Sequence, residues 1–536
     1  MATAELLPKS VTLLDRTMKR QSPTPASIGL FVAALASGLA YIVFHLARDL
    51  DSVSVPSLAP FALLGMALFI ALGFEFVNGF HDTANAVAPV IYTHSLEPHI
   101  AVVWSGLCNL AGVLFSSGTV AFAVVTLLPV ELILKVSSGA GFSMVFALLI
   151  AAILWNLGTW WFGLPASSSH TLVGSIMGVG IANQLLGARS GTSGIDWDQA
   201  VKVLKALLIS PVLGFMLAGL LIYVSKALIK FPALYTAPKN QEPPPFPIRA
   251  LMVLTCTGVS FFHGSNDGQK GMGLITLILI GTVPTAYALN HAISPAEVQQ
   301  FIVASAQAGQ ILDRHVDPKG IVGPNARDTV TDYIRTRHLQ PGTVLAMREL
   351  VNDLGHEVAL YGEFKAVPAQ DQANVRNDMY VVSEALAQMQ RTNDPAFTPQ
   401  ERAALAGYKK HIDRATKFIP AWVKVAVALA LGLGTMVGWK RIVVTVGEKI
   451  GKEHLTYAQG ASAGLVAIGT IFAADNFGLP VSTTHILSSG IAGTMAANGS
   501  GVRFSTVRNI ATGWVLTLPA AALLSGLLYW LFRHLA

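Results

Sequence analysis

The chain has 536 residues, of which 52% are hydrophobic and only 12% are charged, about half the charged fraction of an ordinary soluble domain. This composition excludes an ordinary soluble protein and predicts a chain embedded in a lipid bilayer. The net charge of +6 arises from basic residues that are scattered among the loops. A nucleic-acid partner would require them to cluster on one soluble face, so no such partner is expected.

Long apolar runs without charge recur along the whole chain. At about 20 apolar residues per crossing, these runs predict roughly ten to eleven transmembrane crossings. The basic tail at residues 1–27 predicts a cytoplasmic N-terminus, and the basic loops at 226–249 and 440–452 are expected on the same side. The following apolar stretch is too long for a signal peptide, so residues 28–58 are interpreted as an additional transmembrane helix and its loop.

A proline-rich connector at residues 239–249 divides the membrane part into two halves. The first membrane repeat is expected at 59–238, and the second at 250–293 and 418–536. Between the two pieces of the second repeat, residues 294–417 contain 14 Lys and Arg against 15 Asp and Glu and no run long enough to cross a bilayer. Its apolar residues recur every three or four positions, which predicts a soluble helical insert.

Two pairs of similar motifs link the halves. GFHD at 79–82 aligns with GSND at 264–267, and their aspartates lie 185 positions apart. FGLPASSSHTLVG at 162–174 aligns with FGLPVSTTHILSS at 477–489, at an offset of 315 positions. The difference between the offsets matches the length of the insert. The sequence therefore indicates a duplication with a later insertion, as in transporters built from two related repeats.

The FGLP motifs have the pattern of a helix start, with proline in the first turn and a hydroxyl residue as the cap. A helix that starts inside the membrane is half of a broken or re-entrant segment, and its free N–H groups face a cavity. Two such ends could clasp one tetrahedral oxyanion. A packing role for the hydroxyl groups is the alternative, but repetition in both halves favours a binding site formed by Ser167, Ser168, Ser169, Ser482, Thr483 and Thr484.

Two carboxylates, Asp82 and Asp267, lie between apolar segments, where an ionised group is costly unless it is paired or hydrated. A proton or Na⁺ on these carboxylates would remove their repulsion of an anion, so both are expected to couple cation and substrate binding. Lys270 either pairs with Asp267 or faces the anion. His170 and His485 suit proton coupling or a structural role. Amide groups for the anion or the cation are available at Asn85, Asn266 and Gln269.

Four long motifs resemble the bacterial low-affinity inorganic phosphate transporter (Pit) family. They are NGFHDTANAVAPVIYT (78–93), GLPASSSHTLVGS (163–175), HGSNDGQKGMGL (263–274) and GLPVSTTHILSSGIAGTM (478–495). The resemblance implies an all-α polytopic membrane protein with two inverted repeats, whose broken or re-entrant helices meet at a central substrate site. It covers the chain from about residue 60 onward.

The resemblance also implies a function. Such a protein would import inorganic phosphate across the inner (cytoplasmic) membrane by alternating access, in symport with protons, and would accept a neutral complex of phosphate with Mg²⁺ or another divalent metal. No cofactor is expected, no metal ligand is assigned, and a homodimer is suggested. The family's phosphate and cation site maps onto Asp82, Asn85, Ser167–Ser169, Asn266, Asp267 and Ser482–Thr484.

Three alternatives remain open. Sodium coupling is disfavoured because sodium-dependent relatives carry a glutamate where this chain has Cys108 and Asn109. A sulfate permease on the same scaffold is disfavoured because phosphate, unlike sulfate, can donate a hydrogen bond to a carboxylate. An intramembrane hydrolase would use a serine of 167–169 with His170 and Asp82. However, adjacent residues on a helix point about 100° apart, so Ser169 and His170 would not face each other.

Glu75 lies two helical turns before Asp82 and has no equivalent in the second half, so no role is assigned to it. Cys108 and Cys256 both lie within apolar runs and indicate neither a disulfide framework nor a cysteine metal site.

Overall fold

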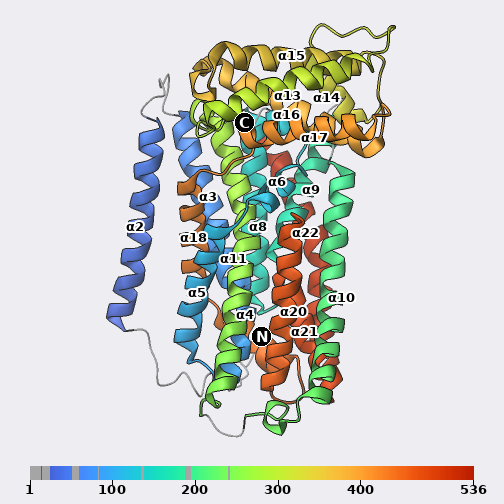
Figure 1. Cartoon of the computed structure of the whole chain (residues 1–536). Coiled ribbons are helices and arrows are strands. Elements are labelled where there is room, and N and C mark those ends of the chain that lie inside the picture. Colours follow the sequence, from blue (N-terminus) through green and yellow to red (C-terminus); the bar gives the residue numbers. More distant parts are fainter. Residues whose placement is uncertain are drawn as a thin grey trace, which may run out of the picture.

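The computed structural model describes residues 14, 24–50, 59–82, 84–134, 138–187, 195–238 and 242–535. The basic side chains of the N-terminal tail therefore lie outside the described residues. Within them the chain is helical, without a named strand, and a single isolated bridge joins Gly451 to Val502. Long helices stand side by side in a bundle that carries a group of shorter helices at one end (Figure 1). The predicted all-α fold is confirmed.

The bundle contains helices from both halves of the chain. Those of the first half are α2 (Pro25–Leu50), α3 (Ala59–Asp82), α4 (Ala84–Tyr92), α5 (Pro98–Phe115), α6 (Thr119–Val125), α7 (Val130–Leu134), α8 (Gly139–Trp161), α9 (Ser168–Leu186) and α10 (Trp197–Leu228). Those of the second half are α11 (Phe246–Thr282), α12 (Pro284–Tyr287), α18 (Ala421–Thr435), α19 (Lys440–Val444), α20 (Tyr457–Asn476), α21 (Thr483–Asn498) and α22 (Phe504–Leu535).

Eight spans in the described part of the chain are long and apolar enough to cross a membrane, or nine when a bent pair, α17 and α18, is counted as one span. This number is smaller than the ten to eleven crossings expected from the apolar runs. The runs that include the FGLP motifs each contain a chain reversal followed by a helix, α9 or α21, that does not meet these criteria. Counting apolar residues alone therefore overestimated the number of full crossings.

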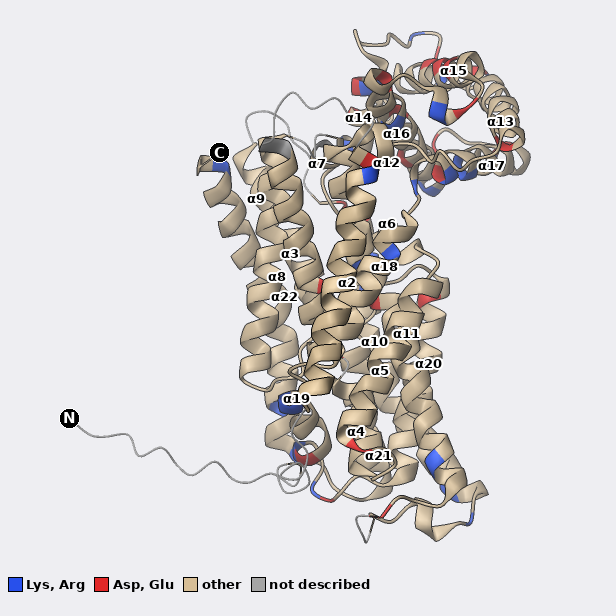
Figure 2. Cartoon of the chain, turned by 90° about the vertical axis from the view of Figure 1, so that its left-hand side faces the viewer, with Lys and Arg blue, Asp and Glu red and all other residues tan. Residues whose placement is uncertain are grey.

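The insert (residues 294–417) forms five helices at one end of the bundle (Figures 1 and 2). Two of them begin with a capping box, formed by Ser294 with Glu297 and by Thr398 with Glu401, which marks their starts in the sequence. The five helices are α13 (Pro295–Asp313), α14 (Ala326–Thr336), α15 (Thr343–Tyr361), α16 (Ala369–Thr392) and α17 (Pro399–Thr416). Charged residues gather in this group and at the opposite end of the bundle (Figure 2).

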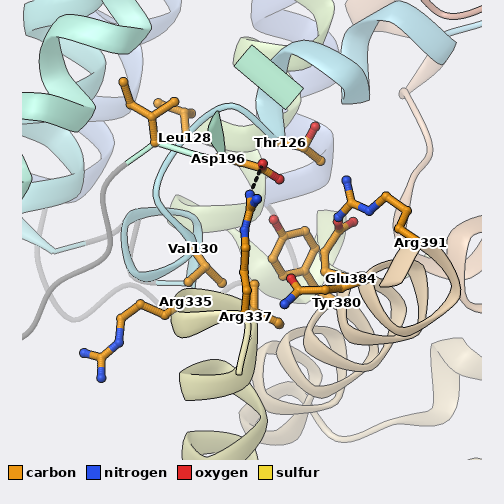
Figure 3. A pocket seen from close by; sticks show the side chains of 12 residues that line it. Thr126, Leu128, Val130, Asp196, Arg335, Arg337, Tyr380, Glu384 and Arg391 are labelled. Carbon is orange, nitrogen blue, oxygen red and sulfur yellow. Dashed lines mark hydrogen bonds and ion pairs between the residues drawn. The ribbon is translucent and has the colours of Figure 1, made fainter. Parts of the chain in front are cut away.

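An arginine at the end of α14 attaches the insert to the bundle. Arg337 adopts the left-handed conformation with φ of 61°. Its guanidinium pairs with Asp196 and Asp198 at the start of α10. Asp196 also caps α10 by accepting from the backbone of Asp198 at 3.0 Å. Figure 3 shows the Arg337–Asp196 pair within a cavity between the insert and the bundle. The insert is therefore bonded directly to the membrane part.

Glycines allow the site-bearing helices to approach one another closely. A Cβ atom on Gly79 would lie 2.2 Å from the carbonyl oxygen of Leu431 in α18. A Cβ atom on Gly264 would lie 2.2 Å from the carbonyl oxygen of Asn109 in α5. No real side chain tolerates such distances, so both glycines permit backbone contact between helices. Gly79 and Gly264 are the glycines that begin the GFHD and GSND motifs. Close helix contact therefore explains why both motifs begin with glycine.

Candidate functional site

Two helix starts meet in the middle of the bundle. Ser167 caps α9 by accepting from the backbone N–H of His170 at 3.2 Å, and Ser482 caps α21 by accepting from that of His485 at 3.1 Å. From this meeting point α9 extends toward the end that carries the insert, whereas α21 extends toward the opposite end (Figures 1 and 2). The positive ends of two helix dipoles therefore point into the same buried region.

The loops before these helices have the same construction in both halves. Gly163 and Gly478 have positive φ values of 66° and 62°, which glycine adopts without strain. Pro165 and Pro480 lie in the loops, two residues before the capping serines. The sequence pattern was therefore wrong in placing proline in the first helical turn, although it located both helix starts.

The two helix starts contact each other directly. Ser169 donates a hydrogen bond of 2.8 Å to the carbonyl oxygen of Val481. The rings of His170 and His485 lie 4.4 Å apart, and the His485 ring stacks on Trp514 at 4.1 Å. Both histidines are buried. The two residues proposed for proton coupling thus form one buried pair between the halves.

Asp82 ends α3 and faces the start of α9. Its Oδ2 accepts from the backbone N–H of Ser168 at 3.4 Å, and its Oδ1 accepts from Thr484 at 3.0 Å. His81 Nδ1 lies 2.9 Å from the same Oδ1. Asn85 donates to Thr484 at 3.0 Å and so extends this network into α4. The Asp82 carboxylate occupies the position in which a helix start stabilises negative charge.

Lys270 of α11 pairs with Asp267, one of the two arrangements that the sequence left open, and it also contacts the start of α9. Its ammonium donates to Asp267 at 2.6 Å and also donates to Ser169 Oγ. The carbonyl oxygen of Val481 lies 3.5 Å from the same nitrogen. Lys270 and Asp267 are both buried, so their charges compensate each other away from water. Lys270 therefore places a positive charge against both helix starts.

Asn266 fixes the loop that leads into α21. It donates to the carbonyl oxygen of Leu479 at 3.2 Å and accepts from the backbone N–H of Val481 at 3.4 Å. Thr483 follows in the first turn of α21, and its buried hydroxyl has no hydrogen-bond partner within the described part of the chain. The structure thus brings all the site residues expected from the sequence to one region, with Ser167 and Ser482 acting as caps and Thr483 free to donate.

His263 was not recognised from the sequence, although it lies four residues before Asp267. Its Nδ1 lies 3.0 Å from Asn109 Oδ1, and its Nε2 lies 3.5 Å from Asp267 Oδ2. Together with Asp82, these side chains bring three potential metal ligands within 4.8 Å of one another. The available signal was the one-turn spacing of His263 and Asp267 on a single helix.

Glu75 also belongs to this region. It is fully buried on α3 and accepts from Asn78 at 3.4 Å. A Cβ atom on Gly271 would lie 2.2 Å from Glu75 Oε1, so the absence of a side chain on α11 provides the space for this carboxylate. In the sequence no role was assigned to Glu75, because the second half has no equivalent glutamate. In the structure the residue that faces Glu75 is Gly271, which directly follows Lys270.

A bundle with at least eight apolar spans, in which two oppositely directed helices start at a buried polar site, defines a multi-pass membrane transporter. A sequence profile described as "Phosphate transporter family" matches residues 78–525. The chain therefore belongs to the phosphate transporter family, whose function is transport and not catalysis.

Several relatives align over most of their length. The chain is 38% identical to the low-affinity inorganic phosphate transporter PitB of Escherichia coli (strain K12), over 88% of this chain and 97% of the relative. It is 39% identical to PitA of the same organism, over 88% and 96%. A probable low-affinity inorganic phosphate transporter of Bacillus subtilis (strain 168) is 27% identical, over 87% and 96%. A solved sodium-dependent phosphate transporter is 19% identical, over 89% and 100%, with a TM-score of 0.47.

Proposed function

We propose that the chain imports inorganic phosphate across the inner membrane, by alternating access and in symport with protons. The observation that carries this proposal is the meeting of the α9 and α21 starts beside the Lys270 ammonium. An oxyanion there would find backbone N–H groups, a buried cation and the free hydroxyl of Thr483. Such a set of donors suits an anion with several acceptor oxygens, such as phosphate.

The position of Asp82 supports coupling to a cation. In the structure its carboxylate accepts hydrogen bonds from the N–H of Ser168 and the hydroxyl of Thr484. An incoming phosphate would need the same two donors. A proton on Asp82 would weaken these bonds and reduce the repulsion of the anion. Asp82 and Asp267, with the His170–His485 pair nearby, are therefore the candidates for proton coupling.

Divalent metal as part of the cargo is a second element of the proposal. Asp82, His263 and Asp267 offer one ligand atom each within 4.8 Å. Carboxylates suit Mg²⁺, which retains several waters and binds phosphate oxygens, whereas an imidazole favours Zn²⁺ and other transition metals. A metal-phosphate complex could then enter with the metal on this trio and the phosphate oxygens on the helix starts.

We further propose two inverted repeats with the insert on the outer side of the membrane. The opposite directions of α9 and α21 support the inverted relationship. The end at which α10 meets α11 carries Lys226 and Lys230, and α19, which begins with Lys440 and Arg441, lies toward the same end (Figure 2). Cytoplasmic loops are enriched in Lys and Arg, so this end is assigned to the cytoplasm together with the start of α2.

Uptake by the purified protein in liposomes tests this function. Radiolabelled phosphate is followed under an inside-alkaline pH gradient, with and without Na⁺, with sulfate as competitor, and with Asp82→Asn as the control variant. Accumulation that depends on the pH gradient and is lost in the variant supports proton symport. Accumulation only with Na⁺ would show that Na⁺, and not the proton, is the coupling ion. Absence of phosphate accumulation under both conditions would show that phosphate is not the substrate, and radiolabelled sulfate in the same assay would then test the sulfate alternative.

A further inference from the structure

The side of the insert that lines the cavities next to the bundle is rich in basic residues. The insert as a whole contains 14 basic and 15 acidic residues, so it is almost neutral overall. Three cavities lie between it and the bundle, and the insert residues that line them include only two acidic ones, Glu384 and Asp413. The basic insert residues that line the same cavities are Arg335, Arg337, Arg376, Arg391, Lys409, Lys410, Arg414 and Lys417. The insert thus presents a positive face to the membrane part.

The largest of the three, hereafter the vestibule, has a volume of about 620 Å³. Its insert side is formed mainly by α17, and its bundle side by residues 117–119 and the first turns of α6. Lys409 and Lys417 bond to Asp413 at 2.5 and 3.0 Å, and Lys417 also bonds to Glu384 at 3.1 Å. These four groups largely compensate one another.

The remaining cations of the vestibule are Lys410 and Arg414, and both are exposed. Arg414 lies 3.3 Å from Glu297, but at 54% exposure this pair is weak and leaves the guanidinium accessible. The neighbouring cavity adds Arg335, Arg337 and Arg391, of which Arg337 pairs with Asp196 and Asp198, and Arg335 pairs with Asp332 (Figure 3). Lys410 and Arg414 therefore supply the uncompensated positive charge of the vestibule.

A chain of hydrogen bonds leads from the vestibule to the central site. At the floor of the vestibule, Thr119 donates to the carbonyl oxygen of Asp475 at 3.3 Å, and the N–H of Val120 donates to Gln269 at 2.9 Å. Gln269 and Ser265 in turn donate to the Asp475 carboxylate at 2.6 and 2.7 Å. Ser265 directly precedes Asn266, whose side chain fixes the start of α21. The vestibule is thus the compartment next to the binding site on the insert side.

We propose that the vestibule is a capture site for inorganic phosphate, in which Lys410 and Arg414 bind the anion before it passes the hydrogen-bonded chain of Thr119, Gln269 and Asp475. This inference rests on the proposed phosphate uptake and on the insert lying outside. A cavity with uncompensated positive charge raises the local concentration of an anion and its rate of entry. Because the two cations are exposed, salt screens this attraction.

The test compares charge reversal inside and outside the vestibule. In the full chain in liposomes, Lys410→Glu with Arg414→Glu is expected to raise the KM for phosphate uptake about 3- to 10-fold, with an unchanged maximal rate. The dependence of kcat/KM on ionic strength should become flatter in the same variant. Lys319→Glu with Lys365→Glu is the matched control, because both lysines are exposed on the insert and neither lines the three cavities. The glutamine variants at 410 and 414 should give a smaller effect of the same sign.

Each outcome has a separate meaning. If the wild-type chain accumulates phosphate but the variants at 410 and 414 match the control in KM and salt dependence, the capture site is wrong and the transport function stands. If the wild-type chain does not accumulate phosphate, the proposed function itself fails. The uptake is repeated in vesicles of phosphatidylcholine alone. An effect that appears only when phosphatidylglycerol is present would assign Lys410 and Arg414 to lipid headgroups and overturn capture of free phosphate.

Discussion

Thr484 donates a hydrogen bond of 3.0 Å to Asp82, although 402 positions separate the two residues. The bond joins the first turn of α21 to the last residue of α3, so each half of the chain supplies one partner. Neither half could form this part of the site alone.

Thr484→Val should reduce kcat/KM for phosphate uptake about 10- to 100-fold, because a hydrogen bond to a charged group contributes about 1.5–3 kcal/mol. Valine preserves the shape of the side chain but cannot donate to Asp82. Thr484→Ser retains the hydroxyl and should remain within about threefold of the wild type. Equal uptake by the valine and serine variants would show that this bond has no part in transport.

Lys270→Gln should destabilise the protein by about 3–5 kcal/mol, because it leaves the buried Asp267 carboxylate without its cation. The expected result is a lower unfolding temperature of the purified protein in detergent. The double variant Asp267→Asn with Lys270→Gln removes both charges and should recover most of the unfolding temperature without recovering phosphate uptake. A double variant as unstable as the single one would contradict the compensating role of this pair.

Gly271→Ala should lower the unfolding temperature, because its Cβ atom would lie 2.2 Å from Glu75 Oε1. Forcing an extra methyl group into a packed site costs about 1–3 kcal/mol. Gly469→Ala in α20 is the matched control, since nothing lies within 4 Å of a Cβ atom built there. We expect the control to be neutral or slightly stabilising. Similar unfolding temperatures for the two variants would exclude close packing of Glu75 against α11.

The insert should lose stability at low pH through Asp413. Burial alone would raise the pKa of this carboxyl, but Lys417 and Lys409 beside it lower the pKa below its ordinary value. A lowered pKa in the folded state contributes stability above the unfolded pKa of about 3.9, and this contribution disappears as the pH falls through the folded value. Asp413→Asn should therefore weaken the packing of α17 at pH 7, and its effect should shrink as the pH falls through the lowered pKa of Asp413 in the folded state.

Hydrogen exchange of the α17 amides in the full chain, corrected for the intrinsic rates, measures this effect. Protection in the wild type should exceed that in Asp413→Asn at pH 7, and the two should converge in acid. A difference between them that does not change with pH would mean that Asp413 acts through its shape and its hydrogen bond with Ser383, and not through its charge.

The sequence predicted the features that depend on local patterns. Apolar runs indicated a membrane bundle, and the repeated hydroxyl triplets located the starts of α9 and α21 within one residue. The count of crossings was too high, because hydropathy does not distinguish a chain reversal within an apolar run from a full span. The position of proline was also wrong, because the glycines before it turn the chain earlier than a simple helix-start pattern assumes.

Features that depend on packing between distant helices could not be predicted. Glu75 meets Gly271 across the contact between α3 and α11, and His263 meets Asp82 only because α3 and α11 place them together. Neither contact leaves a periodic signal in the sequence. The positive face of the insert is similarly hidden, because its basic residues come from α14, α16 and α17 and are separated along the chain by acidic ones.

The 37-residue helix α11 has a mechanical consequence. It runs without interruption from the end assigned to the cytoplasm to the insert, and it carries Asn266, Asp267 and Lys270 near its middle. A continuous helix of this length tilts as a rigid rod. Tilting α11 would therefore shift Asn266 and Lys270 relative to the start of α21 and would move the base of the insert at the same time. The same movement of α11 would thus couple a change at the central site to a change at the insert end of the bundle.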